Sequence, residues 1–296
     1  MNCINIYVEK CNFWKGIRVS TKVMSPVLKW AGGKTQLLEE LMSKVPQTYN
    51  TYFEPFIGAG AFFLSLKPKS AVINDTNEQL INLYQQLKHS PSEIISIVSS
   101  LDEVACDKNY YYKIRERYNQ KITSKELDPE CAALMIWINK HCFNGLYRVN
   151  SQGFFNVPYN NKVTGKSLDK DNVEAISRFL KEQNVTILCS DFENACKEVS
   201  PGDFVYLDSP YVPESSSADF TDYTKTGFSY EDHDRLADLF VRLDKLGAYV
   251  MLSNNDVPLV RELYREYNIE PLEVKRLINR NAAKRSGKEV IVTNYQ

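Results

Sequence analysis

The sequence of 296 residues lacks the signatures of several common protein classes. Its seven cysteines are scattered without a C-x-x-C pair, which argues against both a disulfide framework and a zinc site. The three histidines, His89, His141 and His233, lie far apart and predict no metal site. No G-x-S-x-G elbow is present to support a hydrolase triad. We therefore expect chemistry that needs no metal ion.

The sequence also lacks an excess of charge of either sign and lacks long apolar runs. The net charge is −1, so any nucleic-acid contact has to come from local basic clusters. No apolar run reaches the length of a membrane span, and the longest, Cys131 to Ile138, suits a buried helix. Residues 1–23 hold no apolar stretch typical of a secretory signal, and recognisable patterns begin only at Met24. We interpret residues 1–23 as an N-terminal extension and expect a cytoplasmic protein with no membrane partner.

Strands and helices are expected to alternate in two parts of the chain. Apolar runs predict strands at 51–54, 71–73, 185–188, 204–207, 248–252 and 289–295. Helical patterns begin near Ala61 and Glu78, after the first two of these strands. This alternation predicts a parallel α/β sheet. Residues 90–184 break the rhythm with three helical patterns and two β-prone runs around a turn at Gly153, so we predict an inserted domain with a hairpin.

Two features predict a cofactor that carries a nucleoside. The loop Gly58-Ala59-Gly60 lies between a strand and a helix, where glycine lets the backbone approach a ligand. Asp75 ends the next strand, where an acid can accept hydrogen bonds from ribose hydroxyls. A tight turn and a helix N-cap are the respective alternatives. The dinucleotide fingerprint is incomplete because position 63 is Phe63, which favours S-adenosylmethionine over NAD.

The segment Asp208-Ser209-Pro210-Tyr211 follows the apolar run at 204–207. A carboxylate that leaves a buried strand into a Pro-Tyr turn suits a site for a planar amine. Acceptors reach the amine hydrogens, and an aromatic face stacks on the ring. An ordinary strand-to-loop turn is the alternative. Asp191 and Phe192 follow another strand, where they could hold an adenine amino group and its ring, or cap a helix beside a core aromatic.

Two clusters could contact nucleic acid. The first, on the predicted hairpin and its flanks, contains Phe143, Tyr147, Arg148, Asn150, Phe154, Asn156 and Tyr159. Arg and Asn make bidentate contacts to base edges, and aromatic side chains can wedge where a base leaves the stack. The second cluster contains Lys275, Arg276, Arg280, Lys284, Arg285 and Lys288 without an intervening acid. It suits phosphate contacts, or a solvated face.

From Ser25 onward the chain resembles the Dam-type DNA adenine methyltransferases of GATC modification systems. The matching segments are residues 28–34, 53–60, Asn74-Asp75, 142–159 and 208–211, in the family's order. The resemblance implies a Rossmann-like, S-adenosylmethionine-dependent methyltransferase fold of the α/β class, with an inserted helical and β-hairpin target-recognition domain. The catalytic domain would comprise residues 24–89 and 185–296, and the target-recognition domain residues 90–184.

The resemblance also implies roles for individual residues. The cofactor contacts are Trp30, Lys34, Phe56, Gly58, Gly60, Asp75, Asp191, Phe192 and Asp208. The DNA contacts are Lys29, Phe143, Asn144, Leu146 and Arg148, and residue type adds Asn150, Arg280, Lys284 and Arg285. Arg148 would read a guanine, Phe143 would wedge into the stack, and Lys29 would help to read the outer base.

The implied reaction is methyl transfer to the exocyclic amine of an adenine that has left the duplex, with Asp208, Ser209, Pro210 and Tyr211 as the catalytic segment. The partner would be double-stranded DNA, and a companion restriction endonuclease is a further candidate. The family usually has proline where this chain has Ser209, but serine keeps the backbone carbonyl that the role requires. Two alternatives stay open: a DNA-binding homologue with impaired catalysis, and a methyltransferase for RNA or a glutamine amide.

Overall fold

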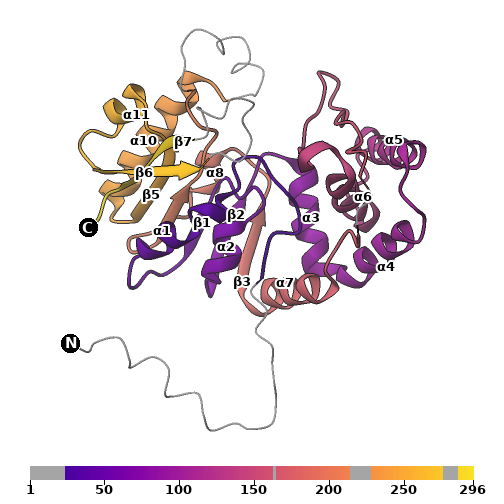
Figure 1. The fold of residues 1–296 in the computed structure, drawn as a ribbon. Coiled ribbons are helices and arrows are strands. Elements are labelled where there is room, and N and C mark those ends of the chain that lie inside the picture. The colour runs from indigo at the N-terminus through magenta and orange to yellow at the C-terminus, as the bar shows by residue number, and fades with distance from the viewer. Residues whose placement is uncertain (1–23, 163–164, 214–227, 276–285) are drawn as a thin grey trace, which may run out of the picture.

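A seven-stranded mixed sheet forms the centre of the protein (Figure 1). The computed structural model describes residues 24–162, 165–213, 228–275 and 286–296. The strands are β1 (Tyr52–Glu54), β2 (Ser70–Asn74), β3 (Asn184–Leu188), β4 (Phe204–Leu207), β5 (Tyr249–Asn255), β6 (Asn268–Lys275) and β7 (Ser286–Thr293). Their order is β3-β2-β1-β4-β5-β7-β6. Strands β1 to β5 run parallel to one another, whereas β7 runs antiparallel to its neighbours β5 and β6.

Helices cover both faces of the sheet, which explains why its central strands are apolar on both sides. Tyr52, Phe204 and Tyr206 belong to one core and Phe53, Val205 and Leu207 to the other. The first core includes α1 (Leu38–Ser43), α2 (Ala61–Leu66), α3 (Glu78–His89) and α7 (Lys170–Glu182). The second includes α8 (Phe192–Ala195), α10 (Tyr230–Leu246) and α11 (Pro258–Leu263). The predicted α/β arrangement is confirmed, but the sheet is mixed rather than wholly parallel, because β7 runs antiparallel to β5 and β6.

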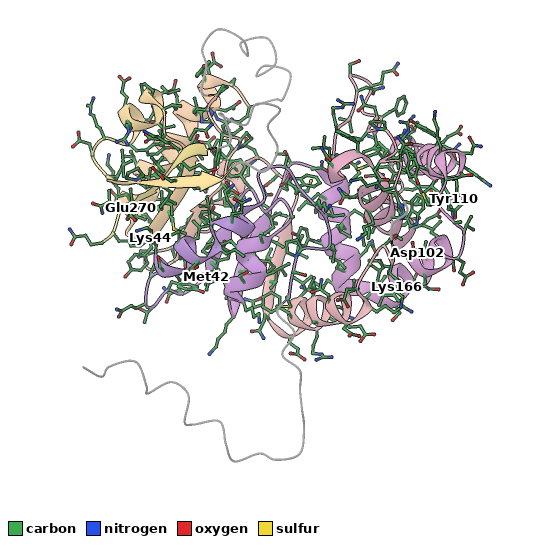
Figure 2. The ribbon with its side chains drawn as sticks, viewed as in Figure 1. Met42, Lys44, Asp102, Tyr110, Lys166 and Glu270 are labelled. Carbon is green, nitrogen blue, oxygen red and sulfur yellow. The ribbon has the colours of Figure 1, made fainter. Side chains whose placement is uncertain are left out.

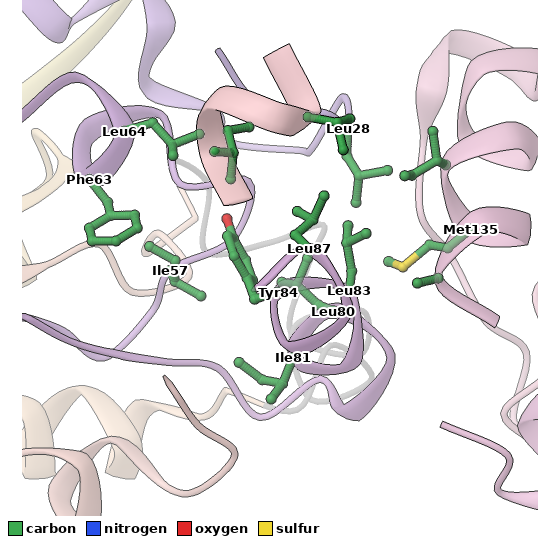
Figure 3. Close-up of a cluster of buried hydrophobic side chains, with 14 of the residues drawn as sticks. Leu28, Ile57, Phe63, Leu64, Leu80, Ile81, Leu83, Tyr84, Leu87 and Met135 are labelled. Atoms are coloured by element: carbon green, nitrogen blue, oxygen red, sulfur yellow. The ribbon is translucent and has the colours of Figure 1, made fainter. Parts of the chain in front are cut away.

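Three more helices, α4 (Pro91–Asp102), α5 (Lys108–Ser124) and α6 (Pro129–His141), lie on the far side of α3 from the sheet (Figure 1). The expected buried helix over 131–138 is confirmed, because all eight of these side chains in α6 are at most 1% exposed. Met135 of α6 faces the leucines of α3, which in turn pack beside Leu64 of α2 (Figure 3). One core therefore joins these helices to the sheet.

The predicted hairpin is present in reduced form. Neither of its two runs forms a strand; an isolated antiparallel bridge joins Val149 to Phe155. Asn150 N–H donates to the carbonyl of Phe154 over 2.9 Å, and Asn156 N–H donates to the carbonyl of Arg148 over 3.1 Å. Asn119 of α5 anchors this short hairpin through both backbone polar groups of Phe155, at 2.8 and 3.1 Å. The hairpin is therefore attached to a helix.

The sheet extends further than the apolar pattern indicates. β5 runs on to Asn255, and the last strand spans residues 286–293 rather than 289–295. β6 was not expected from the sequence, because it contains Pro271 and several charged residues. It is one of the two edge strands of the sheet, and an ion pair between Glu270 and Lys44 ties it to the end of α1 (Figure 2). In the part of the chain that the structure describes, no helix is long and apolar enough to cross a bilayer. The extension at residues 1–23 lies outside that part.

Candidate active site

A cavity of about 570 Å³ opens at the carboxyl edge of the parallel strands. It lies where the strand order reverses between β1 and β4, which is the usual ligand position in open α/β sheets. Its volume falls within the range of about 300–1,000 Å³ that is typical of small-molecule sites. The cavity brings together every residue predicted to contact the cofactor or to act in catalysis: Trp30, Lys34, Phe56, Gly58, Gly60, Asp75, Asp191, Phe192, Asp208, Ser209, Pro210 and Tyr211.

The glycine loop after β1 is packed tightly between two aromatic side chains. Gly58 and Gly60 both have left-handed backbones, with φ of +48° and +71°. A Cβ on Gly60 would lie 2.5 Å from the hydroxyl oxygen of Tyr84, and one on Gly58 would lie 3.2 Å from Trp30 Cδ1. The Tyr84 hydroxyl also donates to the carbonyl of Gly58 over 3.0 Å. Glycine is therefore required at both positions, and the backbone forms the cavity floor.

Asp75 faces this loop from the end of β2. Its carboxylate accepts hydrogen bonds from the N–H groups of Gly58, at 3.2 Å, and Asn77, at 3.0 Å. The N-cap of α3 is Asn77, which accepts from Leu80 N–H, so Asp75 is not the cap that the alternative interpretation required. Burial raises the pKa of Asp75. The carboxylate retains acceptor positions for a hydroxyl-bearing ligand.

Asp191 and Phe192 form the wall beyond β3. Asp191 is the N-cap of α8 and accepts from Glu193 N–H over 3.0 Å. Phe192 is 4% exposed and packs against Phe56 and Phe228, with ring centroids 5.4 and 6.0 Å away. The interpretation of Asp191 as a helix cap is confirmed, and Asp191 also lines the cavity.

Asp208 and Tyr211 face a common position in the cavity. The ammonium of Lys34 occupies it, 2.6 Å from Asp208 Oδ1 and 4.6 Å from the centroid of the Tyr211 ring. Ser253 Oγ donates to the same carboxylate over 3.0 Å. Burial raises the pKa of Asp208, while Lys34 and Ser253 lower it. The turn therefore binds an amine between an acid and an aromatic face.

The sequence did not predict several residues at or beside the cavity, among them Ser253, Asn254, Asn255 and Glu54. Asn254 Oδ1 accepts from Val212 N–H over 2.9 Å, and Asn255 donates to the carbonyl of Val212 over 2.6 Å, so both fix the turn after β4. With Ser253 they form a polar triplet directly after the apolar part of β5. That position, at the carboxyl edge of the sheet, was the signal that could have identified them.

Glu54, at the end of β1, is another of these residues. It lines the cavity but is only 3% exposed, and the Tyr52 hydroxyl donates to it over 2.6 Å. Burial, with a smaller contribution from the charge of Asp208, raises its pKa well above the ordinary value, against the opposing effects of Tyr52 and Lys34. Ionisation of Glu54 is therefore less favourable in the folded protein than in water.

Ser209 is 2% exposed, and within the part of the chain that the structure describes its Oγ has no hydrogen-bond partner. A buried, unpaired hydroxyl is unfavourable, so hydrogen bonding by the side chain does not account for serine at this position. The backbone of Ser209 is the remaining group that can act in the site.

Comparison with known proteins identifies the family. Residues 30–278 match the D12 class of N6 adenine-specific DNA methyltransferases. The chain belongs to this family. It is 45% identical over 276 residues to the Type II methyltransferase M1.LlaDCHI of Lactococcus lactis subsp. cremoris, covering 92% of this chain and 96% of that protein. It is 40% identical over 290 residues to the Type II methyltransferase M.MjaIII of Methanocaldococcus jannaschii, covering 92% and 99%. The DNA adenine methylase of Escherichia coli (strain K12) is 32% identical over 272 residues, covering 91% and 94%.

These matches confirm the predicted Rossmann-like methyltransferase fold and the predicted methylation of adenine in DNA. The protein is an adenine-specific DNA methyltransferase, and its fold implies S-adenosylmethionine as the methyl donor. The cavity has features that suit that donor: a glycine floor, the buried carboxylate of Asp75 and an aromatic wall. The alternatives of an RNA or glutamine methyltransferase and of an impaired DNA binder are set aside.

The segment with the predicted DNA contacts adjoins the cavity of this methyltransferase. Asn139 of α6 accepts from Lys29 N–H over 2.9 Å and donates to the carbonyls of Lys29 and Gly145 over 3.0 and 2.9 Å. The rings of Trp30 and Tyr147 stack with centroids 5.1 Å apart. The cavity wall and the hairpin are therefore joined directly.

The predicted DNA contacts differ in their surroundings. Phe143, which is 51% exposed, belongs with Asn144 to the short helical turn η2 (Phe143–Gly145), and Leu146 after it is half-buried. Arg148 is exposed, and its Nε donates to Asn156 Oδ1 over 2.8 Å. Asn150 Oδ1 accepts from two N–H groups of its own turn, at 3.0 Å each, so this oxygen holds the hairpin. Arg280, Lys284 and Arg285 lie outside the described residues.

Proposed function

We propose that the enzyme methylates the exocyclic amine of adenine within GATC in double-stranded DNA, after the target base has left the helix. The GATC target follows from the family resemblance of the motifs. Base extrusion follows from chemistry, because the amine of a paired adenine is engaged in the duplex and cannot reach a recessed cavity.

Asp208 and Tyr211 are proposed to hold the extruded base. The observation that carries this proposal is the Lys34 ammonium, an amine already bound between Asp208 Oδ1 at 2.6 Å and the Tyr211 ring at 4.6 Å. Asp208 and the carbonyl of Ser209 would accept the two amine hydrogens, and Tyr211 would stack on the ring. The nitrogen lone pair would then point toward the methyl group that S-adenosylmethionine supplies. The Asp208 carboxylate would also stabilise the positive charge that develops on the nitrogen.

The cofactor is proposed to lie across the other residues of the cavity. Asp75 would bind the ribose hydroxyls, and Asp191 and Phe192 would bind the adenine amino group and ring, with Phe56 beside them. Trp30, Lys34 and the Gly58–Gly60 loop would contact the rest of the cofactor. The free acceptor positions of Asp75 and the packing of Phe56 on Phe192 support this orientation.

Residues 90–184 are proposed as the target-recognition domain, set within a catalytic domain of residues 24–89 and 185–296. Arg148 would read a guanine, Phe143 would enter the base stack, and Lys29 would contact the outer base. Further DNA contacts would come from Asn144, Leu146, Asn150, Arg280, Lys284 and Arg285. The exposure of Phe143 and Arg148, on the segment whose Tyr147 stacks on Trp30 of the cavity, supports this surface. We further propose a cytoplasmic enzyme that acts without a metal ion, with a companion restriction endonuclease as a candidate partner because two relatives are named Type II methyltransferases.

Transfer of a tritiated methyl group tests this function. The substrates are a duplex with one GATC site, a matched duplex in which that site reads CATG, so that both adenines are kept and remain paired, and an RNA of the same sequence. We expect incorporation into the first duplex only, with at least about a hundredfold preference. Equal incorporation into both duplexes would contradict GATC, and incorporation into the RNA alone would contradict DNA as substrate.

A further inference from the structure

Arg235 of α10 contacts both members of the proposed adenine pocket of the cofactor. Its Nη2 donates to Asp191 Oδ1 over 2.9 Å, and its guanidinium lies 4.7 Å from the centroid of the Phe192 ring. Nη2 also donates to Glu193 over 2.8 Å, and Nη1 to Asp232 over 2.8 Å. Three carboxylates thus hold one planar cation, so its orientation is fixed.

This arrangement gives the two oxygens of Asp191 different environments. Oδ1 accepts from Arg235 and from Glu193 N–H, at 2.9 and 3.0 Å. Oδ2 accepts no hydrogen bond from the described residues, and Asp191 lines the cavity. Because the first oxygen is held by two donors, the carboxylate cannot rotate freely, and the second oxygen remains available to an amino group of a ligand.

The ring of Phe192 is fixed by the same cation. The guanidinium of Arg235 contacts the ring of Phe192. Phe56 and Phe228 pack against the same ring, with centroids 5.4 and 6.0 Å away. A cation over an aromatic face is attracted by the negative charge of that face. One side chain therefore orients both the hydrogen-bond acceptor and the stacking surface.

We propose that Arg235 is a positioning residue that makes the cofactor pocket selective for the adenine amino group. The inference rests on the proposed cofactor roles of Asp191 and Phe192. Arg235 itself does not touch the cofactor. It holds Asp191 in the rotamer that accepts from an amine, and it holds Phe192 in the plane that packs on the purine.

The chain offers a matched control on the same helix. Arg242 Nη2 donates to Glu193 over 2.8 Å, but no contact joins Arg242 to Asp191 or Phe192 among the described residues. Arg235→Met and Arg242→Met therefore remove the same charge and the same Glu193 partner. Only the first removes the contacts to the adenine pocket.

Calorimetry of two ligands tests the inference in the full-length enzyme. One ligand is S-adenosylhomocysteine, and the other is S-inosylhomocysteine, in which a carbonyl oxygen replaces the adenine amino group. Wild type should bind the first at least about tenfold more tightly, since the carbonyl faces an acceptor. Arg235→Met should lose most of this ratio, whereas Arg242→Met should keep it. Arg235→Lys, which keeps the charge without the planar fork, should also reduce the ratio; it carries the test if Arg235→Met does not fold.

The possible results are distinct. An Arg235 variant that keeps the wild-type ratio overturns the inference, even if both affinities fall together, because a merely structural role weakens the two ligands equally. A wild type that binds both ligands equally overturns the inference together with the proposed role of Asp191. A wild type that binds neither ligand overturns the proposed function itself.

Discussion

The ammonium of Lys34 lies 2.6 Å from Oδ1 of Asp208, and the same nitrogen faces the ring of Tyr211 at 4.6 Å. In the proposed reaction the amine of the target adenine binds to the same carboxylate and the same ring. The two amines therefore compete, and Lys34 has to shift as the base enters. The pair thus marks the position at which the substrate nitrogen is expected.

Asp208→Ala removes the carboxylate from this position. We expect turnover to fall by at least about a thousandfold, because both the orientation of the amine and the stabilisation of its developing charge are lost. Affinity for S-adenosylhomocysteine should change by less than about tenfold, since the other cavity residues remain. Single-turnover methyl transfer and calorimetry measure the two effects, with Asp238→Ala on the exposed side of α10 as the control. Turnover within tenfold of wild type would contradict the role of Asp208.

Glu54 predicts a pH dependence of stability. Its pKa is raised well above the ordinary value, chiefly by burial. The folded state therefore binds more protons than the unfolded state. As pH rises from the ordinary pKa of a glutamate toward the raised pKa of Glu54, the free energy of unfolding falls. Glu54→Gln cannot ionise, so its stability relative to wild type should rise across that window, by roughly 1.4 kcal/mol for each pH unit. Urea unfolding of both proteins from about pH 5 to about pH 8 measures the difference; a constant difference would contradict the prediction.

The hydroxyl of Ser209 predicts a stabilising substitution. Its Oγ is buried and has no partner among the described residues, so folding removes it from water without replacing its hydrogen bonds. Ser209→Ala should raise the free energy of unfolding by about 1 kcal/mol. Thermal and denaturant unfolding check this, with Ser253→Ala as the contrasting variant, because Ser253 Oγ donates to Asp208. A destabilised Ser209→Ala would indicate a hydrogen bond with residues outside the described part of the chain.

The backbone of Ser209 predicts the result of a second substitution. Ser209→Pro keeps the carbonyl that is proposed to accept an amine hydrogen, and it fixes φ of the turn. Turnover should stay within about twofold of wild type or rise. Methyl transfer under saturating cofactor and DNA measures it. A large loss of turnover in a folded variant would refute the view that only the carbonyl of this residue takes part.

Asn156 is predicted to orient Arg148 for base reading. The Oδ1 of Asn156 accepts a hydrogen bond from Arg148 Nε over 2.8 Å, and the backbone N–H of Asn156 donates to the Arg148 carbonyl over 3.1 Å. Asn156→Ala removes only the first bond, so the hairpin should persist while the guanidinium loses its direction. Discrimination between GATC and a duplex with adenine in place of the guanine should fall by about tenfold. Gln152→Ala, elsewhere in the same hairpin, is the control; an unchanged ratio in Asn156→Ala would contradict the assignment.

The sequence predicted the parts of the site that follow apolar strands. Glycine between a strand and a helix, and acids directly after strands, are typical of ligand sites in α/β proteins. The Gly58–Gly60 loop, Asp75 and Asp208 were therefore identified from local pattern alone. Their convergence in one cavity depends on strand order, which places the ends of β1, β2, β3 and β4 at the same edge.

Residues that act through distant partners could not be predicted in this way. Arg235 lies 44 positions from Asp191 in sequence, and nothing local distinguishes it from Arg242 on the same helix. Glu54 has the sequence context of an ordinary strand residue, and only the fold buries it beside Asp208. The hairpin was expected from its turn, but only the fold shows that an isolated bridge joins its two runs and that Asn119 attaches it to α5.

The central claim is that the turn after β4 holds an adenine that has left the duplex. A crystal structure of the enzyme with S-adenosylhomocysteine and a GATC duplex tests it most directly. We predict the adenine amine within hydrogen-bonding distance of Asp208 and the Ser209 carbonyl, its ring stacked on Tyr211 and Lys34 displaced from the carboxylate. An adenine that remains paired in a bound cognate duplex, with Lys34 still on Asp208, would contradict the claim.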